Sequence, residues 1–163
     1  MGPTPIQIVP WSREWPRQYE AEIARIGSVV TSLTFHHIGS TSIPGCAAKP
    51  IIDIMGVVGN AERFAADRWL LSQTLGYESL GEYGVPGRDF FFRYTDANFH
   101  ISVFRSGDEN IANNLRFRDR LTTDQTLRER YVALKDEAAN AHRDDHAAYN
   151  AYKSELIAEI LRR

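Results

Sequence analysis

The sequence is poor in cysteine and has no excess of one charge, no long apolar run and no low-complexity tract. Its single cysteine, Cys46, excludes an internal disulfide framework and a zinc site built from several thiolates, and it is typical of a reducing compartment. The net charge of −2 provides no broad basic surface, so we expect no binding to duplex nucleic acid. No apolar run approaches the length of a membrane span, and the N-terminus lacks a signal-peptide pattern. These absences predict a soluble cytoplasmic protein without a membrane partner.

The length and composition fit one globular domain. The chain has 163 residues, of which 43% are hydrophobic and 25% charged, close to ordinary globular usage. This length is enough for one domain with a substantial core and too short for two domains of ordinary size. We therefore predict a single domain over residues 1–163. The oligomeric state is left open.

Helical and strand patterns alternate in the first two thirds of the chain. Apolar residues at helical spacing from Trp15 to Val30 predict a helix with Ser12 as its N-cap. A second helix is predicted over residues 60–75, with Gly76 as its stop. The predicted strands cover residues 5–11, 33–38, 50–58, 88–94 and 99–104. The strand over residues 50–58 is nearly all apolar, which is typical of a strand buried on both faces. The last two strands are expected to form a hairpin.

The last third of the chain is helical in pattern. From residue 108 onward, apolar residues recur at helical spacing over about 111–121, 127–141 and 149–160. No internal repeat is present. The predicted fold class is therefore α+β, with a mixed sheet and flanking helices followed by a helical C-terminal tail.

A Gly-Ser turn followed by a strand with a single acid is the first candidate site. Gly39 and Ser40 follow one predicted strand, and Asp53 lies in the next, where strand alternation places it on one face with Ile51. Free backbone N–H groups and a hydroxyl at the turn can bind phosphate, and the carboxylate can hold Mg²⁺. Lys49 would add a phosphate contact. The alternative is a plain tight turn and a buried acid paired with Lys49 or an arginine.

Longer stretches of the sequence resemble the GrpB family, whose members are similar in fold to the nucleotidyltransferase superfamily. The matching segments are "VPWSREWPRQYEAE" at 9–22, "HHIGSTSIPGCAAKPIIDI" at 36–54, "LGYESLGEYGVPGRDFFFR" at 75–93, "FHISVF" at 99–104, "LRFRDRL" at 115–121, "YVALK" at 131–135 and "YNAYKSELI" at 149–157. The resemblance covers almost the whole chain. It implies a nucleotidyltransferase-like mixed sheet with a helical C-terminal tail.

The superfamily pattern pairs a Gly-Ser motif with two metal-binding carboxylates one residue apart on the next strand. Counted from Gly39, the two places fall at Ile51 and Asp53, so Asp53 matches the second acid and Ile51 does not match the first. The nearest equivalent of a third superfamily carboxylate is the strand face that carries His100 and Ser102. The resemblance therefore implies one metal ligand, Asp53, and the vacant place at Ile51 weakens the case for a two-metal mechanism.

Basic residues elsewhere are candidates for neutralising phosphate charge. Arg88 and Arg93 lie in or beside the predicted hairpin. In the tail, Tyr131 and Lys135, like Tyr149 and Lys153, are spaced i, i+4, so each pair projects from one helix face. The alternative is that the tyrosines pack in the core and the lysine stems run along them.

The glycine-rich segment over residues 81–87 precedes Arg88. Its glycines have the wrong order and spacing for a dinucleotide-binding fingerprint. One interpretation is a flap that brings Arg88 to a ligand as it closes. The other is a plain connection without a ligand role.

Three further titratable features are interpreted from their local patterns. Cys46 lies among small residues, and no histidine or basic residue stands near it at a spacing that indicates contact. This favours an inert packing residue. His37 is the histidine that can serve the Gly-Ser turn, as a structural imidazole or as a ligand. Arg118 and Asp119 either form an interior ion pair that anchors the tail to the sheet, or Asp119 replaces the missing carboxylate.

The sequence predicts a protein that binds a nucleotide or another phosphorylated small molecule. The reaction that the resemblance implies is Mg²⁺-dependent nucleotidyl transfer from a nucleoside triphosphate to a small-molecule acceptor, with Asp53 and His100 as catalytic residues. The predicted phosphate or ligand contacts are Gly39, Ser40, Thr41, Ser42, Lys49, Arg88, Tyr131, Lys135 and Lys153. One alternative is a noncatalytic ligand- or partner-binding module on a degenerate nucleotidyltransferase fold. The other is an ATP-dependent, ligase-type transferase.

Overall fold

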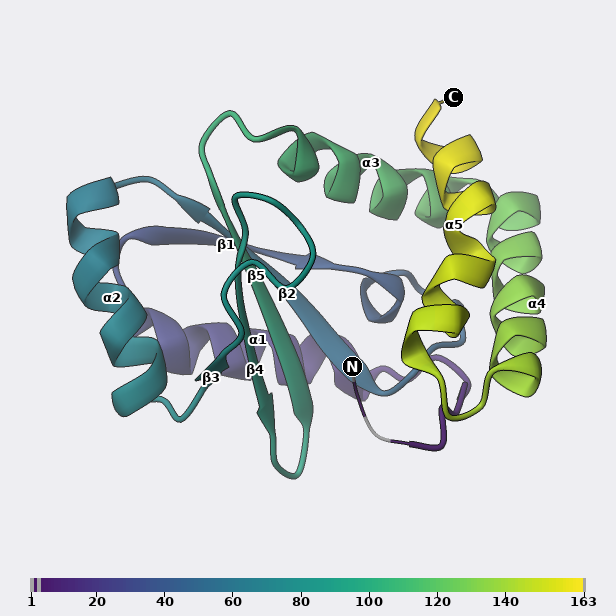
Figure 1. The fold of residues 1–163 in the computed structure, drawn as a ribbon, viewed down its shortest axis with the longest axis horizontal. Coiled ribbons are helices and arrows are strands. Elements are labelled where there is room, and N and C mark those ends of the chain that lie inside the picture. Colours follow the sequence, from purple (N-terminus) through teal and green to yellow (C-terminus); the bar gives the residue numbers. More distant parts are fainter. Residues whose placement is uncertain (1, 3, 163) are drawn as a thin grey trace.

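A five-stranded mixed sheet forms the centre of the computed structural model, which describes residues 2 and 4–162 (Figure 1). The strands are β1 (Leu33–Ile38), β2 (Ile51–Val58), β3 (Glu78–Ser79), β4 (Asp89–Tyr94) and β5 (Asn98–Arg105). Their order across the sheet is β1-β2-β5-β4-β3. β2 and β5 run parallel, whereas the other neighbouring pairs are antiparallel. The mixed sheet and the β4–β5 hairpin confirm the sequence prediction, whereas the short strand predicted over residues 5–11 is wrong, because Val9 forms only an isolated bridge to Ala48.

Helices flank the sheet. They are α1 (Glu14–Gly27), α2 (Ala61–Gln73), α3 (Glu109–Thr123), α4 (Gln125–Ala141) and α5 (His146–Arg162), and a short 3-10 turn, η1 (Ser40–Ser42), follows β1. Figure 1 shows α2 at one end of the molecule and α4 and α5 side by side at the other. None of the helices in the described part of the chain has the length and apolarity needed to cross a bilayer.

Side-chain caps explain where three of these helices begin. Asn60 accepts a hydrogen bond from the backbone N–H of Arg63 at 2.9 Å, and Asp124 accepts one from Leu127 at 2.9 Å. Asp108 accepts from the N–H of Asn110 at 2.8 Å. Each carboxylate or amide oxygen satisfies a backbone donor that has no partner within its own helix.

The central position of β2 explains its apolar sequence. Its side chains alternate, and Ile52 and Ile54 enter the main core against residues of α1 and α2 such as Ile26 and Leu71. Asp53 therefore points to the opposite face, on the side of the C-terminal helices. One face of β2 packs in the main core, and the other carries Asp53 beside Met55, which is buried against Ile38 and Phe104.

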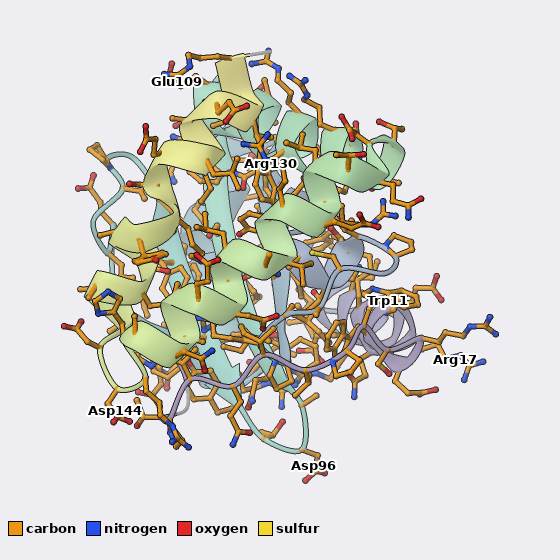
Figure 2. All side chains as sticks on the ribbon, turned by 90° about the vertical axis from the view of Figure 1, so that its right-hand side faces the viewer. Trp11, Arg17, Asp96, Glu109, Arg130 and Asp144 are labelled. Carbon is orange, nitrogen blue, oxygen red and sulfur yellow. The ribbon has the colours of Figure 1, made fainter. Side chains whose placement is uncertain are left out.

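The C-terminal helices have a small core of their own, which also holds the segment after η1. Buried members of this cluster include Ile43, Cys46, Leu121 and Tyr131. At the surface of this end, Arg130 on α4 forms an ion pair with Glu159 on α5 at 3.1 Å; Figure 2 shows Arg130 where the two helices run side by side. The helical tail is thus joined to the Gly-Ser region by apolar packing.

The interpretation of Arg118 and Asp119 as an interior ion pair is wrong. The two side chains are 2.8 Å apart, but the Asp119 side chain is 64% exposed, so the pair lies at the surface. Arg118 alone makes the connection to the sheet, because its guanidinium donates a hydrogen bond to the backbone oxygen of His37 at 3.2 Å. Asp119 does not line the cavity described below, so it does not replace a carboxylate there.

Candidate functional site

A cavity of about 560 Å³ lies between the exposed face of the sheet, η1 and the helical tail. The strands contribute Asp53 of β2 and His100 of β5, the turn contributes Ser40, and the tail contributes Lys135 of α4 and Lys153 of α5. The sheet brings the first two together by register, because Asp53 and His100 are paired across the parallel strands. This volume falls within the range of about 300–1,000 Å³ typical of small-molecule sites.

The Gly-Ser turn approaches Asp53 more closely than any side chain would allow. Gly39 has a φ of +69°, and a Cβ atom placed on it would lie 2.6 Å from Oδ2 of Asp53. Glycine is therefore required at this position both by the backbone conformation and by the contact. The consequence is a carboxylate held directly beside the backbone of the turn.

The hydroxyl groups after Gly39 have different roles. Ser40 lines the cavity. Thr41 is buried and also lines the cavity, but its Oγ1 is 3.0 Å from Nε2 of His37. Ser42 lies outside the cavity lining, and its hydroxyl donates to the backbone oxygen of Gly39 at 2.5 Å. The prediction of Ser42 as a ligand contact is corrected by this placement: Ser42 stabilises the turn.

His37 is a structural imidazole. Its ring stacks on Tyr19 of α1 with centroids 4.6 Å apart, and burial lowers its pKa to about 4. It therefore stays neutral at physiological pH, with its Nε2 engaged by Thr41.

Asp53 is half-buried and faces a histidine. Its Oδ1 lies 3.5 Å from Nδ1 of His100, and the Asp53 side chain is 40% exposed. On the other side of the ring, Nε2 of His100 is 2.9 Å from the hydroxyl of Tyr94. Among the residues described, Asp53 forms no ion pair with Lys49 or an arginine, so the alternative of a buried structural acid does not hold.

Three lysines line the cavity, and one of them reaches the Gly-Ser turn. Lys135, which is 2% exposed, donates from Nζ to Oγ of Ser40 at 3.0 Å and to the backbone oxygen of Ala47. Nζ of Lys153 lies 4.1 Å from the centroid of the Tyr149 ring, and Nζ of Lys49 lies 5.0 Å from the same centroid. Two ammonium groups thus share one aromatic ring.

The protonation of these lysines is costly. Burial lowers the pKa of Lys49 and of Lys135. Burial, together with the neighbouring charges of Lys49 and Lys135, lowers the pKa of Lys153 to about 7. Among the described lining residues, the three lysines and Arg88 face one carboxylate, Asp53. The cavity therefore has a surplus of positive charge.

The placement of lysine in this chain is selective. The sequence has three lysines against sixteen arginines, and all three lysines line this cavity. Arginine thus supplies the basic charge everywhere else in the sequence. The rarity of lysine is a property of the sequence alone, and it is a signal that groups Lys49 with Lys135 and Lys153.

The tyrosine–lysine pairs pack in the core and also direct their lysines to the cavity, so they fit both interpretations made from the sequence. Tyr131 and Tyr149 are 4% and 1% exposed, and burial raises the pKa of each. Their paired lysines pass along the rings, as a structural role requires. The ammonium groups of Lys135 and Lys153 nevertheless reach the same cavity. Contact of these groups with a ligand stays a prediction.

Cys46 has a basic neighbour that its sequence context does not reveal. Its buried Sγ lies 3.5 Å from Nζ of Lys135. Cys46 packs in the core of the C-terminal helices, as its sequence context predicts, and Lys135 reaches it from a helix about ninety residues further along the chain.

The glycine-rich loop lies against the cavity. Arg88 donates to the backbone oxygen of Tyr83 at 2.6 Å and lies over the ring of Phe90, 4.7 Å from its centroid. Tyr83 and Val85 of the same loop line the cavity. Arg93 points elsewhere, because it pairs with Glu22 of α1 at 3.0 Å. Closure of this loop over a ligand stays a prediction.

Several lining residues were not predicted from the sequence, among them Tyr83, Asn114 and Asn150. Asn150 precedes Lys153 by one helical turn, so the spacing that groups Tyr149 with Lys153 also reaches it. Asn114 comes from α3, and no spacing rule relates that helix to Asp53.

Curated relatives resemble this chain over most of its length. A UPF0157 protein of Halalkalibacterium halodurans is 33% identical over 168 residues, which cover 97% of this chain and 82% of the relative. The UPF0157 protein YqkA of Bacillus subtilis is 32% identical, over 93% of this chain and 45% of YqkA. A dephospho-CoA kinase of Mycolicibacterium paratuberculosis is 30% identical, over 98% of this chain and 46% of the kinase. The chain thus spans about half the length of the last two relatives.

Solved structures extend the comparison. The crystal structure of the conserved protein GrpB from Enterococcus faecalis matches with a TM-score of 0.84 and 28% identity, over 96% of this chain and 98% of that one. Terminal uridylyl transferase 4 of Trypanosoma brucei, solved with bound UTP, matches with a TM-score of 0.52 and 14% identity, over 90% of this chain and 50% of the transferase. The sheet and helical tail therefore follow a nucleotidyltransferase-like fold. The family model described as GrpB protein matches residues 5–163, and the chain belongs to the GrpB family.

Proposed function

We propose that the cavity binds the phosphate groups of a nucleotide or a related phosphorylated small molecule. The observation that carries this proposal is the convergence of Lys49, Lys135 and Lys153 on one cavity with a single described carboxylate, Asp53. Charge repulsion and burial make these ammonium groups unfavourable in the unliganded protein. An anion between them offsets that cost, and strongly perturbed titratable groups in a cavity are typical of functional sites.

The fold and the relatives guide the choice of ligand. The structural neighbour from Trypanosoma brucei was solved with UTP, which makes nucleoside triphosphates the first class to test. A relative is named dephospho-CoA kinase, which adds dephospho-CoA and coenzyme A, both of which carry an adenine nucleotide. Fold alone does not establish either ligand.

A single Mg²⁺ fits the donor set better than two. Asp53 is a half-exposed carboxylate in the cavity, and Mg²⁺ commonly binds one or two carboxylates together with substrate phosphates. Ile51, at the place of the first superfamily acid, is 4% exposed and offers no oxygen. When bound, the ion would neutralise phosphate charge at Asp53, while the lysines would neutralise it at the Gly-Ser turn.

Nucleotidyl transfer to a small-molecule acceptor is a second candidate function, favoured by the contact between Asp53 and His100. A carboxylate at Nδ1 favours the tautomer with hydrogen on that nitrogen, leaving Nε2 to accept a proton. Nε2 already contacts the hydroxyl of Tyr94, so an acceptor would have to displace that contact to lose its proton to His100. Ligand binding without transfer requires no such rearrangement, and the apolar Ile51 is consistent with it.

A thermal-shift screen tests the proposal. The ligands are ATP, GTP, CTP, UTP, dephospho-CoA, coenzyme A and inorganic tripolyphosphate, each with and without Mg²⁺. A ligand present at 100 times its Kd should stabilise the protein by about 2.7 kcal/mol. If no phosphorylated compound raises the unfolding temperature at millimolar concentration, the proposed function is wrong.

Replacing Asp53 with Asn should separate the contribution of Mg²⁺ to ligand affinity from the contribution of the lysines. We expect Asp53→Asn to abolish the Mg²⁺-dependent part of ligand affinity. The affinity without Mg²⁺ should stay equal or rise, because the substitution removes a negative charge that repels phosphate. Calorimetric titration with and without Mg²⁺ measures both. Asp119→Asn is the matched control, since that carboxylate is exposed and outside the cavity. An unchanged Mg²⁺ response in Asp53→Asn contradicts the metal role.

A further inference from the structure

The cavity has a second, aromatic part formed by Tyr83 and Phe90, which we call the ring platform. The two rings are stacked, with centroids 5.1 Å apart and planes 20° from parallel. Phe90 is 4% exposed, and Tyr83 is 46% exposed. Both line the cavity. One large aromatic ring is therefore supported from beneath by a buried ring and is half open to the cavity and solvent.

The buried ring of the platform is held firmly. Phe90 lies on β4, where it pairs in register with Ser102 of β5. The His100 ring meets it edge-on with centroids 5.1 Å apart, and the guanidinium of Arg88 lies 4.7 Å from its centroid. Phe90 thus supplies a rigid support at the sheet, which is the preorganisation that a stacking site needs.

Tyr83 is held in an unusual conformation by contacts that do not involve its ring. Among the described residues it is the one non-glycine with a positive φ, at +44°. Arg88 fixes the loop by donating to the backbone oxygens of Tyr83 at 2.6 Å and of Glu82 at 3.2 Å. Gly87 donates its N–H to Oε1 of Glu82 at 2.8 Å. The loop is therefore held by hydrogen bonds between the Arg88 and Glu82 side chains and its backbone, and a strained backbone that presents an exposed aromatic side chain points to function.

The ring platform and the lysines lie in different parts of the cavity. Phe90 is on β4, and β5 separates β4 from β2, which carries Asp53. Two steps across a sheet correspond to about 10 Å. Lys135 reaches Ser40 in the turn that follows β1, on the side of β2 away from β5, and Lys49 and Lys153 meet at the ring of Tyr149 on α5. A ligand that contacts both parts must carry a ring at one end and phosphates at the other, joined by a linker, which is the layout of a nucleoside phosphate.

We propose that a nucleobase of the ligand stacks on Tyr83 while the phosphates lie among Lys49, Lys135 and Lys153. This inference rests on the proposed function and makes it specific: the ligand is a nucleotide, and not an inorganic polyphosphate or a sugar phosphate. Stacking of a base on an aromatic side chain tolerates different bases, because every base has a π face. The ring platform thus selects for a base without choosing which one.

The test compares two probes on the same variants by calorimetric titration: each of the four nucleoside triphosphates, and inorganic tripolyphosphate. The wild-type protein should bind at least one nucleotide ten-fold or more tightly than tripolyphosphate. Tyr83→Leu should lose about ten-fold of that nucleotide affinity and keep its affinity for tripolyphosphate. Tyr83→Phe should retain the wild-type affinity for both. Tyr152→Leu is the matched control, an exposed tyrosine on α5 outside the cavity lining.

The outcomes separate this inference from the proposed function. If neither probe binds to the wild-type protein, phosphate binding itself is wrong. If tripolyphosphate binds as tightly as every nucleotide, and Tyr83→Leu changes neither, phosphate binding stands and the ring platform is wrong. A loss of affinity for both probes in Tyr83→Leu also overturns the platform, because it shows that Tyr83 acts through the loop and Arg88. Unfolding curves of each variant confirm that the protein is folded before titration.

Discussion

Replacing Lys153 with Met should stabilise the unliganded protein and weaken ligand binding at the same time. Methionine keeps most of the apolar stem that packs on Tyr149 and removes a charge that is 9% exposed and close to Lys49 and Lys135. Each unit by which a pKa is displaced corresponds to about 1.4 kcal/mol, so we expect a gain of at least about 1 kcal/mol at pH 6. Loss of a charge-assisted hydrogen bond to phosphate should lower affinity about ten-fold or more. Urea unfolding and calorimetric titration with tripolyphosphate measure the two effects.

A gain in stability together with a loss of ligand affinity distinguishes a lysine that binds ligand from one that only stabilises the fold. A lysine kept for packing and for its contact with Tyr149 would lose stability on replacement and leave binding unchanged. Arg130→Met on α4 is a control for the loss of a positive charge at an exposed ion pair outside the cavity. Lower stability of Lys153→Met together with unchanged affinity for tripolyphosphate would exclude a role in binding.

The same lysine should make stability depend on pH. Because the pKa of Lys153 is about 7 in the folded protein and 10.5 for a free side chain, the unfolded chain binds more protons between these values. The free energy of unfolding should therefore rise with pH from 7 toward 9, by up to about 1.4 kcal/mol per unit. Lys49 and Lys135, whose pKa values are also lowered, contribute in the same direction, and the nearby Asp53 carboxylate opposes the shift.

Lys153→Met should flatten this rise, which urea unfolding at pH 6, 7, 8 and 9 can measure. Lysine labelled with ¹³C at Cε provides a direct check, because the chain has three lysines and therefore three signals to titrate. Phosphate binding should raise the pKa of Lys153, so affinity should fall as the pH passes 7. An unliganded Lys153 that titrates near 10 contradicts both expectations.

Replacing Gly39 with Ala should damage both the turn and the carboxylate beside it. The new Cβ would lie 2.6 Å from Oδ2 and 3.1 Å from Cβ of Asp53. The φ of +69° with ψ of −176° belongs to a region that is essentially restricted to glycine. We expect a loss of about 2–4 kcal/mol in the free energy of unfolding. Because the Asp53 carboxylate must swing away from the new methyl group, the Mg²⁺-dependent part of ligand affinity should also disappear.

Gly81→Ala is the matched control for Gly39→Ala. Gly81 also has a positive φ, at +61°, but a Cβ there would meet no atom within 4 Å. Its replacement should therefore cost only the backbone strain, about 1–2 kcal/mol. Equal losses in the two variants, with an unchanged Mg²⁺ response in Gly39→Ala, would show that the approach of Gly39 to Asp53 has no consequence for the site.

The sequence contains most of the fold because its elements are marked by local patterns. β2 is recognised from its apolar run, and α4 and α5 from their spacing and the break between them. The alternation within β2 also places Asp53 on the face opposite Ile52 correctly, since strand geometry is local. The Gly-Ser turn and the two tyrosine–lysine pairs are likewise properties of short segments.

Contacts between distant segments could not be predicted in this way. The approach of Lys135 to Cys46 depends on how α4 packs against the segment after η1, and no local pattern encodes that packing. Arg118 reaches the sheet at the backbone oxygen of His37, whereas its neighbour Asp119 is exposed, and nothing in the short segment that holds both residues separates these two placements. Tyr83 was not predicted because its place in the cavity depends on stacking against Phe90, seven residues later and on a different element.

The order of the cavity's parts along the chain has a consequence for synthesis. All five strands of the described sheet are complete at Arg105, whereas Lys135 and Lys153 come from the two helices that follow α3. A ribosome therefore produces the sheet, the turn and Asp53 well before the cations that surround them. A nascent chain that has already paired its strands still lacks two of its three cavity lysines, so the proposed capture of a phosphorylated ligand would have to wait until α5 has left the exit tunnel.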